Sequence, residues 1–473
     1  MKKVVNLLLF IYILLLFYLT KDTVMLPLTI SFSMYMLYNS LFSSVNIKDV
    51  IGTYHDNKKY YLRDKLFLYA ILTIFLIGII LAFISYLIGN TLDIDKLNII
   101  NIFMSFSLIS NILIKVIKEY SEVVGYKKLG NNLINIFYII VLSISVVLIV
   151  LLFNVFKLNN CINFILLYSV NIFVFVVFAV IFYLKIFKRK IKNEDKENIK
   201  YIENVKKIVI NDKRMVICNV IKSSYIYFSI IILYYILINK YNYSYELVSK
   251  SISNTYFYGL IIIYYIFIFI DKYININYDN IKDNFDKNFN KLIKISLNIS
   301  VLLIIISNPL SNLLIGYDYN ILTILVPVLF FYMIYNFIVN IKMKYTKDIS
   351  VLIVLLSGLF IKLIFELPLI NTLYRMGYSL IWGSILSSII GLIVSIIIGI
   401  IFIKCKFKLN LLNNFNNILN IIYESIIYTL VLVLFTLIVK IDTDSRIISL
   451  LVIVFYIFIS ILFSKIRIIL TKK

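Results

Sequence analysis

Long apolar segments alternate with short charged or Asn-rich connections along the whole chain of 473 residues. A helix needs roughly 20 apolar residues to cross a hydrocarbon core about 30 Å thick, and the segments repeat that unit. Several are continuously apolar and show no alternation with a period of two, so they predict helices and not strands. The predicted spans are 4–19, 24–45, 66–90, 97–117, 129–156, 161–184, 215–238, 247–270, 291–314, 319–341, 348–370, 377–403, 415–439 and 446–463.

The composition fits only a membrane environment. Hydrophobic residues make up 62% of the chain and charged residues 15%, with a mean hydropathy of +0.96. A soluble domain is close to half apolar and about a quarter charged. The sequence therefore predicts an all-α, polytopic membrane protein with about 14 transmembrane helices.

The formal net charge is +23, and its placement gives an orientation. If the N-terminus lies in the cytoplasm, most of the 47 Lys and Arg residues fall in cytoplasmic connections, as the positive-inside rule requires. Both termini are then cytoplasmic. The outward connections are short and hold few basic residues: Lys21, Lys96, Lys157, Lys240, Lys250, Arg375, Lys440 and Arg446.

The longest connection, 185–214, divides the spans into six and eight. Within it Ile199, Ile202, Val205 and Val209 recur at helical spacing among lysines, which indicates an amphipathic helix on the cytoplasmic leaflet. A solvated charged linker is the alternative.

Small residues recur every four positions in the span 377–403, on one face of the helix. Such a face lets another backbone approach closely, so it predicts a helix-packing seam rather than a ligand site. The residues are Gly383, Ser387, Gly391, Ser395 and Gly399.

Charges inside spans are the candidates for a substrate site. Lys362 lies about 20 Å from the cytoplasmic end of its span, where a lysine costs roughly 2.5–3.5 kcal/mol on insertion scales. Glu366, one turn further along, could pair with it. Lys362 is either part of an internal ion pair or a cation in a water-filled cavity that meets an anionic substrate. Lys222, and Lys21 with Asp22, are weaker candidates, because they lie closer to the membrane surfaces.

No catalytic residue, metal site or cofactor is expected. His55 is the single histidine, and no Cys/His cluster has metal-ligand spacing. No phosphate-binding loop is present in the sequence, so ATP is not expected to supply energy directly.

Four stretches resemble the multidrug/oligosaccharidyl-lipid/polysaccharide (MOP) flippase superfamily. Its polysaccharide-transporter branch, which includes stage V sporulation protein B and relatives of the lipid II flippases, is the most similar. The stretches are "NIKDVIGTYHDNKKYYLRDKLFLYA" at 46–70, "KEYSEVVGYKKLGNNLINIFYI" at 118–139, "KISLNISVLLIIISNPLSNLLIGY" at 294–317 and "SVLIVLLSGLFIKLIFELPLINTLYRMGYSLIWGSILSSIIG" at 350–391. The chain departs from that branch at Ser44, Val45 and Asn46, where a Gly-Ile-Pro is common.

The resemblance implies two six-helix lobes around a central cavity, 1–184 and 215–408, joined by the linker 185–214 and followed by two appended helices in 409–473. It also implies a flippase that moves an undecaprenyl-linked saccharide across the bacterial cytoplasmic membrane by alternating access, with membrane lipids as partners and a coupling ion or the membrane potential as driving force. No nucleic-acid partner is expected. The alternatives are a multi-span polysaccharide polymerase or ligase, which would need a larger outward loop, and a drug or ion antiporter of the same superfamily.

Overall fold

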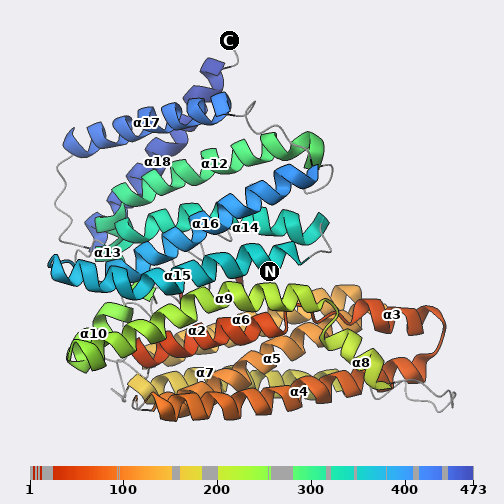
Figure 1. Ribbon diagram of the computed structural model, residues 1–473. Helices are drawn as coiled ribbons and strands as arrows, with labels where there is room; N and C mark the ends of the chain where they lie inside the picture. Colours follow the sequence, from red (N-terminus) through yellow and green to blue (C-terminus); the bar gives the residue numbers. More distant parts are fainter. Residues whose placement is uncertain are drawn as a thin grey trace. The chain divides into compact units, whose positions relative to one another are not determined.

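The computed structural model describes residues 4–5, 8, 11–12, 25–92, 94, 96–151, 160–183, 201–253, 255–256, 281–315, 321–345, 349–379, 381–407, 415–438 and 446–471. Within these residues every regular element is a helix (Figure 1). Ten described helices are long and apolar enough to cross a membrane. The chain is therefore a polytopic all-α membrane protein, as the sequence predicts. Of the fourteen predicted spans, most of 4–19 and residues 257–270 of the eighth lie outside the described residues.

The chain divides into two compact units, Met1–Tyr227 and Phe228–Lys473. Unit 1 contains α2 (Met25–Leu41), α3 (Lys48–Asp56), α4 (Tyr60–Thr91), α5 (Leu97–Val123), α6 (Lys127–Val150), α7 (Asn160–Phe182), α8 (Tyr201–Val209) and the first part of α9 (Lys213–Tyr235). The described part of the predicted linker thus packs within unit 1, where α8 contacts α3 and α4. Beyond the linker, Ser223 of α9 donates to the carbonyl of Met36, 3.3 Å away.

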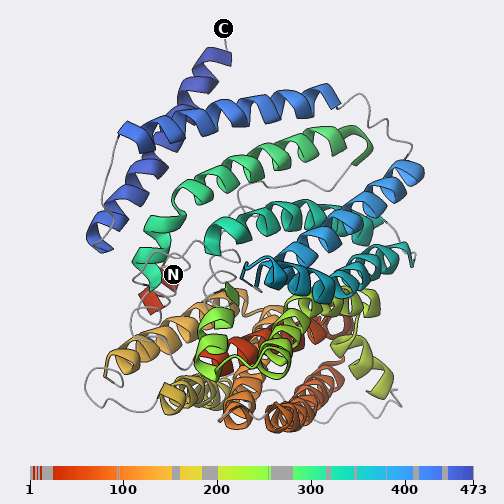
Figure 2. The ribbon, with the colours of Figure 1, turned by 60° about the vertical axis from the view of Figure 1, so that its left-hand side comes forward.

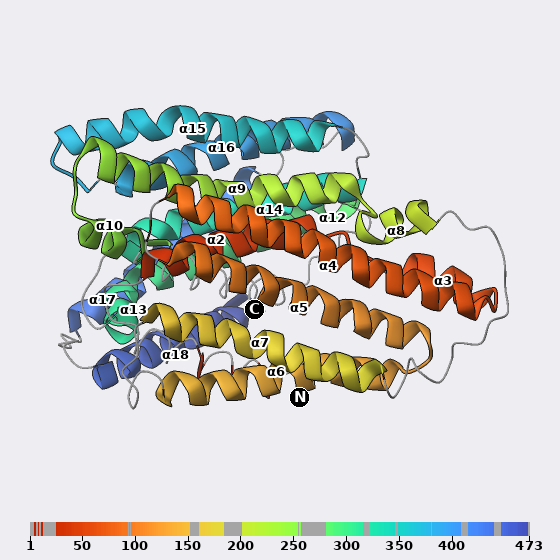
Figure 3. The same cartoon turned by 90° about the horizontal axis from the view of Figure 1, so that it is seen from below.

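Helix α5 is the centre of unit 1, with α2, α4, α6 and α7 packed against it (Figure 3). Two-thirds of the residues in the most apolar part of α5 are buried, compared with one-third in the most apolar part of α4. The outward face of α4 carries exposed apolar side chains, among them Leu72, Leu76 and Phe83. This is the pattern expected where hydrocarbon and not water surrounds the helix. At about 48 Å, α4 is longer than a hydrocarbon core of about 30 Å, so part of it must extend beyond the core.

Unit 2 begins with the end of α9 and a short π-helix, η3 (Ile236–Lys240). It continues with α10 (Tyr245–Ile252), α12 (Ile281–Ile305), α13 (Ser307–Ile315), α14 (Ile321–Tyr345), α15 (Ser350–Arg375), α16 (Ile381–Phe407), α17 (Phe415–Ile438) and α18 (Arg446–Thr471). Helix α16 packs against both α14 and α15, and α14 packs against α12. Helices α17 and α18, predicted as an appended pair, pack on α12 and α13 (Figure 2).

One predicted span is divided in the structure. The segment 291–314 forms two helices, α12 and α13, separated at Ile306. Pro309 has no N–H to donate to the carbonyl of Ile305, and its ring would clash with that carbonyl in a continuous helix. The break therefore falls where proline forbids continuation. Pro327 and Pro368, by contrast, lie inside the continuous helices α14 and α15.

Candidate functional site

Unit 2 buries two opposite charges on one face of α15. The Lys362 side chain is 1% exposed and Glu366 is fully buried. Four residues apart, they lie one turn from each other on the same face of the helix. Lys362 is about 18 Å from the first residue of α15, near the middle of the helix. A charged pair at this depth needs a reason, because bringing charges out of water is costly.

Polar groups from other segments reach Glu366. Ser384 of α16 donates to Glu366 Oε1 at 2.6 Å, and the Tyr256 hydroxyl lies 2.8 Å from Ser384 Oγ. Since the single hydroxyl proton of Ser384 is given to the carboxylate, Tyr256 donates to Ser384. Glu366 Oε2 has no hydrogen-bond partner among the described residues. The arrangement is a buried relay, Tyr256 to Ser384 to Glu366, that ends on a carboxylate with spare acceptor capacity.

The five small residues of α16 lie along the packing of α16 on its neighbours. A Cβ added at Gly391 would be 2.6 Å from the carbonyl oxygen of Gly358 and 3.0 Å from Lys362 Cβ. One added at Gly383 would be 2.6 Å from the backbone of Ile370. The close approach of α15 and α16 thus depends on missing side chains, and the Cβ of Lys362 lies beside it.

The other small residues face neighbouring helices as well. Ser395 donates to the carbonyl of Val354 at 2.9 Å, and Ser387 is fully buried. At Gly399 an added Cβ would lie 2.5 Å from a methyl group of Ile338 on α14. The structure therefore brings Lys362, Glu366 and the small-residue face into one assembly within unit 2.

The remaining sequence candidates are Lys222, Lys21 and Asp22. Lys222 is a partly exposed residue of α9 in the part that belongs to unit 1. Lys21 and Asp22 lie outside the described residues. Among the described residues, no three His, Cys, Asp or Glu side chains lie close enough together to hold a metal ion.

Unit 1 contains a buried charge cluster that sequence reasoning missed. Arg63 and Asp64, at the start of α4, are 1% and 2% exposed. Arg63 Nε donates to Asp64 Oδ1 at 2.6 Å, and the Tyr120 hydroxyl of α5 donates to the same oxygen. Arg63 Nη1 lies 2.9 Å from His55 Nδ1, so the imidazole accepts this bond through Nδ1. The predicted span 66–90 leaves Arg63 in the preceding connection, although an Arg-Asp pair at the start of an apolar run is a signal for burial.

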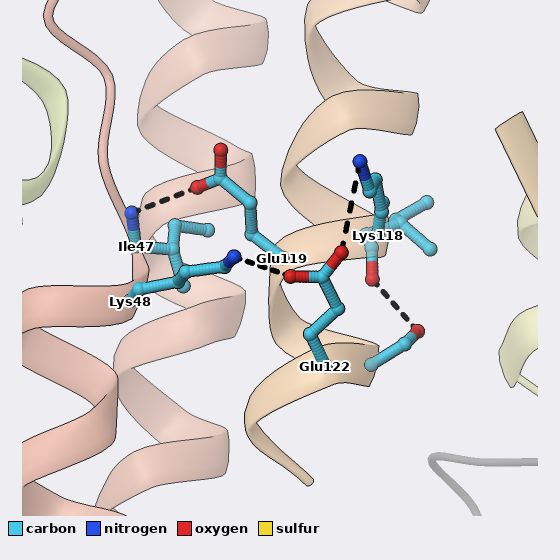
Figure 4. A network of polar contacts seen from close by, with 7 residues as sticks. Ile47, Lys48, Lys118, Glu119 and Glu122 are labelled. Atoms are coloured by element: carbon cyan, nitrogen blue, oxygen red, sulfur yellow. Dashed lines mark hydrogen bonds and ion pairs between the residues drawn. The ribbon is translucent and has the colours of Figure 1, made fainter. Parts of the chain in front are cut away.

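The loop before α3 is fastened to the end of α5 (Figure 4). Glu119 accepts the backbone N–H of Ile47 at 3.1 Å. Glu122 forms ion pairs with Lys48 and, at 3.6 Å, with Lys118. The hydrogen bond to Glu122 raises the pKa of the Lys48 ammonium. Three segments predicted to be cytoplasmic meet here, since Asn204 of α8 also donates to the Tyr54 hydroxyl of α3 at 2.9 Å.

Deeper in unit 1, a chain of uncharged polar groups joins α2, α4 and α5. Ser31 donates to Asn101 Oδ1 at 2.5 Å, and Asn101 donates to the carbonyl of Ser85 at 3.2 Å. Ser85 Oγ lies 3.0 Å from the Tyr38 hydroxyl and 3.1 Å from Ser105 Oγ. These groups satisfy one another without formal charge, so they fix the packing of the three helices.

Comparison with solved structures identifies the fold. A lipid II flippase, MurJ, in an inward closed conformation superposes with a TM-score of 0.65 at 17% identity, covering 99% of this chain and 98% of that one. The chain therefore has the fold of the MOP superfamily. An inward-facing multidrug-resistance MATE transporter of that superfamily superposes with a TM-score of 0.57 at 12% identity, covering 86% of this chain and 95% of that one. No family model and no curated protein matches the sequence.

Proposed function

We propose that this chain is a flippase that moves a lipid-linked saccharide from the cytoplasmic to the outer leaflet of a bacterial cytoplasmic membrane. The observation that carries the proposal is the likeness of fold to a lipid II flippase over almost the whole length of both chains. An undecaprenyl diphosphate-linked headgroup cannot cross hydrocarbon unaided, whereas a protein that alternates between inward and outward openings can lower that barrier. No bond is made or broken in such a step, and a coupling ion or the membrane potential would drive it.

The orientation belongs to the same proposal. By the positive-inside rule, the distribution of basic residues supports cytoplasmic positions for both termini. The loop before α3, the end of α5 and α8 would then form the cytoplasmic end of unit 1, and Gly377, after α15, would lie outside.

Lys362 is the residue to which we assign the substrate phosphate. In this conformation Lys362 is buried with its Cβ beside Gly391 of the α15–α16 seam, and Glu366 supplies the opposite charge. A role in binding therefore requires that the seam separate in another state, so that a phosphate takes the place of Glu366 as counter-charge. If the seam never separates, Lys362 and Glu366 are an internal ion pair and nothing more.

The test is translocation of a fluorescent lipid-linked disaccharide in proteoliposomes, with protein levels matched. The double variant Lys362→Met/Glu366→Gln removes both charges and leaves no orphan, so it should insert and fold. We expect it to lose translocation, while Lys362→Arg retains part of it. The matched control is Lys118→Met/Glu122→Gln, an i,i+4 pair on α5 altered in the same way.

The outcomes separate the claims. Wild-type rates in the double variant would remove Lys362 from the binding site but leave the flippase assignment intact. Absence of translocation in the wild-type protein, with drug or ion exchange in its place, would favour the antiporter alternative. A change in saccharide length or linkage would point to the polymerase or ligase alternative.

A further inference from the structure

A groove in unit 1 lies between α4 and α8. Its volume is about 500 Å³. Tyr69, Thr73 and Ile77 line it from α4, Val205 and Lys206 are among the residues that line it from α8, and Ile210 lines it directly after α8. A volume of this size is in the usual range for sites that take a small organic ligand. The proposed transport function does not use this groove.

The face of α4 that lines the groove continues at one end to a lysine outside the lining. Lys65, Tyr69, Thr73 and Ile77 follow one another at a spacing of four, so they lie on one face of α4 over about 18 Å. The Lys65 ammonium stands 4.8 Å from the ring centroid of Tyr201, and the Tyr69 and Tyr201 rings are 5.4 Å apart. The order is a cation, then aromatic rings, then aliphatic side chains, which matches the order of parts in a phospholipid.

The surroundings of the groove are those of a membrane boundary. Apolar side chains next to it are exposed, with Ile202 of α8 at 85% exposure and Leu72 of α4 at 54%. In contrast, Val205, Ile208 and Val209 of α8 are buried. Helix α8 therefore has one apolar side packed on the protein and a second apolar residue turned outward. An interfacial helix of this kind buries its outward side in the acyl region.

The positive charge at the groove favours an anionic lipid headgroup. Lys206 lines it and is exposed, and Lys65 stands over a ring that lines it. Glu203, the acidic residue of α8, is not among the lining residues. Basic pockets between membrane helices on the cytoplasmic side bind anionic headgroups, and each lysine near the surface contributes about 1 kcal/mol of attraction.

We propose that the α4–α8 groove binds an anionic phospholipid, with the phosphate between Lys65 and Lys206 and an acyl chain along Tyr69, Thr73 and Ile77. The bound lipid fastens α8, which is part of the predicted linker 185–214, against α4.

The test uses a fluorescent reporter in the groove. The chain has one tryptophan, so Trp382→Phe combined with Ile202→Trp places the only indole beside the groove. The full-length protein is reconstituted in phosphatidylcholine vesicles that contain increasing fractions of brominated phosphatidylglycerol or brominated phosphatidylcholine. We expect the phosphatidylglycerol to associate at least about fivefold more strongly, the ratio that about 1 kcal/mol represents.

Adding Lys65→Gln and Lys206→Gln should abolish this preference. The control, Lys58→Gln with Lys207→Gln, removes two exposed lysines of the same end that do not line the groove, and it should keep the preference. Equal quenching by both lipids in the parent, or equal loss in the test and control pairs, would overturn the site. Should the lysine variant fail to fold, Thr73→Phe fills the groove with both lysines present. Native mass spectrometry then measures how much phosphatidylglycerol the Thr73→Phe variant retains. Retention equal to that of the parent protein would also overturn the proposed site.

Discussion

Unit 1 buries Arg63 and Asp64 at the start of α4, whereas unit 2 buries Lys362 and Glu366 in the middle of α15. Each carboxylate has one oxygen without a hydrogen-bond partner in the described part of the chain, Asp64 Oδ2 and Glu366 Oε2. The two sites differ in what surrounds them. Arg63 lies about 4.5 Å from the start of its helix, and Lys362 about four times as far.

The partners differ as well. Arg63 stands against the rings of Tyr60 and Tyr120, 5.1 and 5.6 Å from the ring centroids, and contacts His55. Glu366 receives one hydroxyl, from Ser384, in a seam built of glycine and serine. The first cluster holds its charges with many fixed neighbours. The charges of Lys362 and Glu366 lie instead in a seam between two closely approaching helices.

The largest effect that would sharpen this comparison comes from Asp64→Asn. Asparagine can still accept from Tyr120, but Arg63 is left buried without its counter-charge. We expect a loss of about 3–5 kcal/mol in the free energy of unfolding, measured as thermal unfolding in detergent micelles. The control Arg63→Met/Asp64→Leu removes both charges and should cost much less. A stability within about 0.5 kcal/mol of wild type for Asp64→Asn would mean that the cluster does not depend on its charge balance.

The pattern of apolar residues predicts most of the helices that hold the two buried charge clusters. Helices α4, α5, α15 and α16 overlap the predicted spans because hydrocarbon leaves a helix as the only way to satisfy the backbone. The apolar pattern does not predict whether a single residue interrupts a helix. Pro309 ends a helix and Pro327 does not, and the difference depends on neighbours that periodicity does not contain.

Only the part of the candidate site that lies on a single helix could be predicted from the sequence. The spacing of Lys362 and Glu366 follows from helical geometry. Ser384 and Tyr256 come from segments 18 and more than 100 residues away, and no pattern in the sequence pairs them. Arg63 was assigned to a loop because the apolar run starts at Leu66, although the helix itself begins at Tyr60.

A smaller effect is expected from Lys362→Met alone. The variant leaves Glu366 buried without Lys362, although Ser384 still donates to its Oε1. We expect a loss near 3 kcal/mol, at the lower end for a broken buried pair. The double variant with Glu366→Gln should recover most of it, giving a coupling of about 0.5–3 kcal/mol in a double-mutant cycle of thermal unfolding. Additive single effects would show that the two side chains do not act as a pair.

The seam beside this pair provides the next test. Gly391→Ala places a methyl group 2.6 Å from the Gly358 carbonyl oxygen, so α15 and α16 must move apart. Overpacking of this kind costs about 1–3 kcal/mol. The matched control in unit 1 is Gly52→Ala in α3, where an added Cβ has nothing within 4 Å. That change should stabilise the protein by about 0.5–1 kcal/mol through helix propensity. Equal effects of the two substitutions on thermal unfolding would remove the steric argument for the seam.

The smallest effect concerns the exposed ion pair near the first cluster. The Lys48 side chain is 51% exposed, so its pairing with Glu122 should contribute no more than about 0–1 kcal/mol. Its pKa is raised by the hydrogen bond to Glu122. A raised folded-state pKa gives stability that is fully present below the unfolded value, about 10.4 for lysine, and lost as pH rises through the folded value. The difference between wild type and Lys48→Met should therefore be constant at neutral pH and shrink in alkaline solution. Thermal unfolding at increasing pH measures it, and a difference that grows with pH would contradict the assignment. Lys118→Met is the matched control, because the Lys118–Glu122 distance of 3.6 Å is longer and its effect should be smaller still.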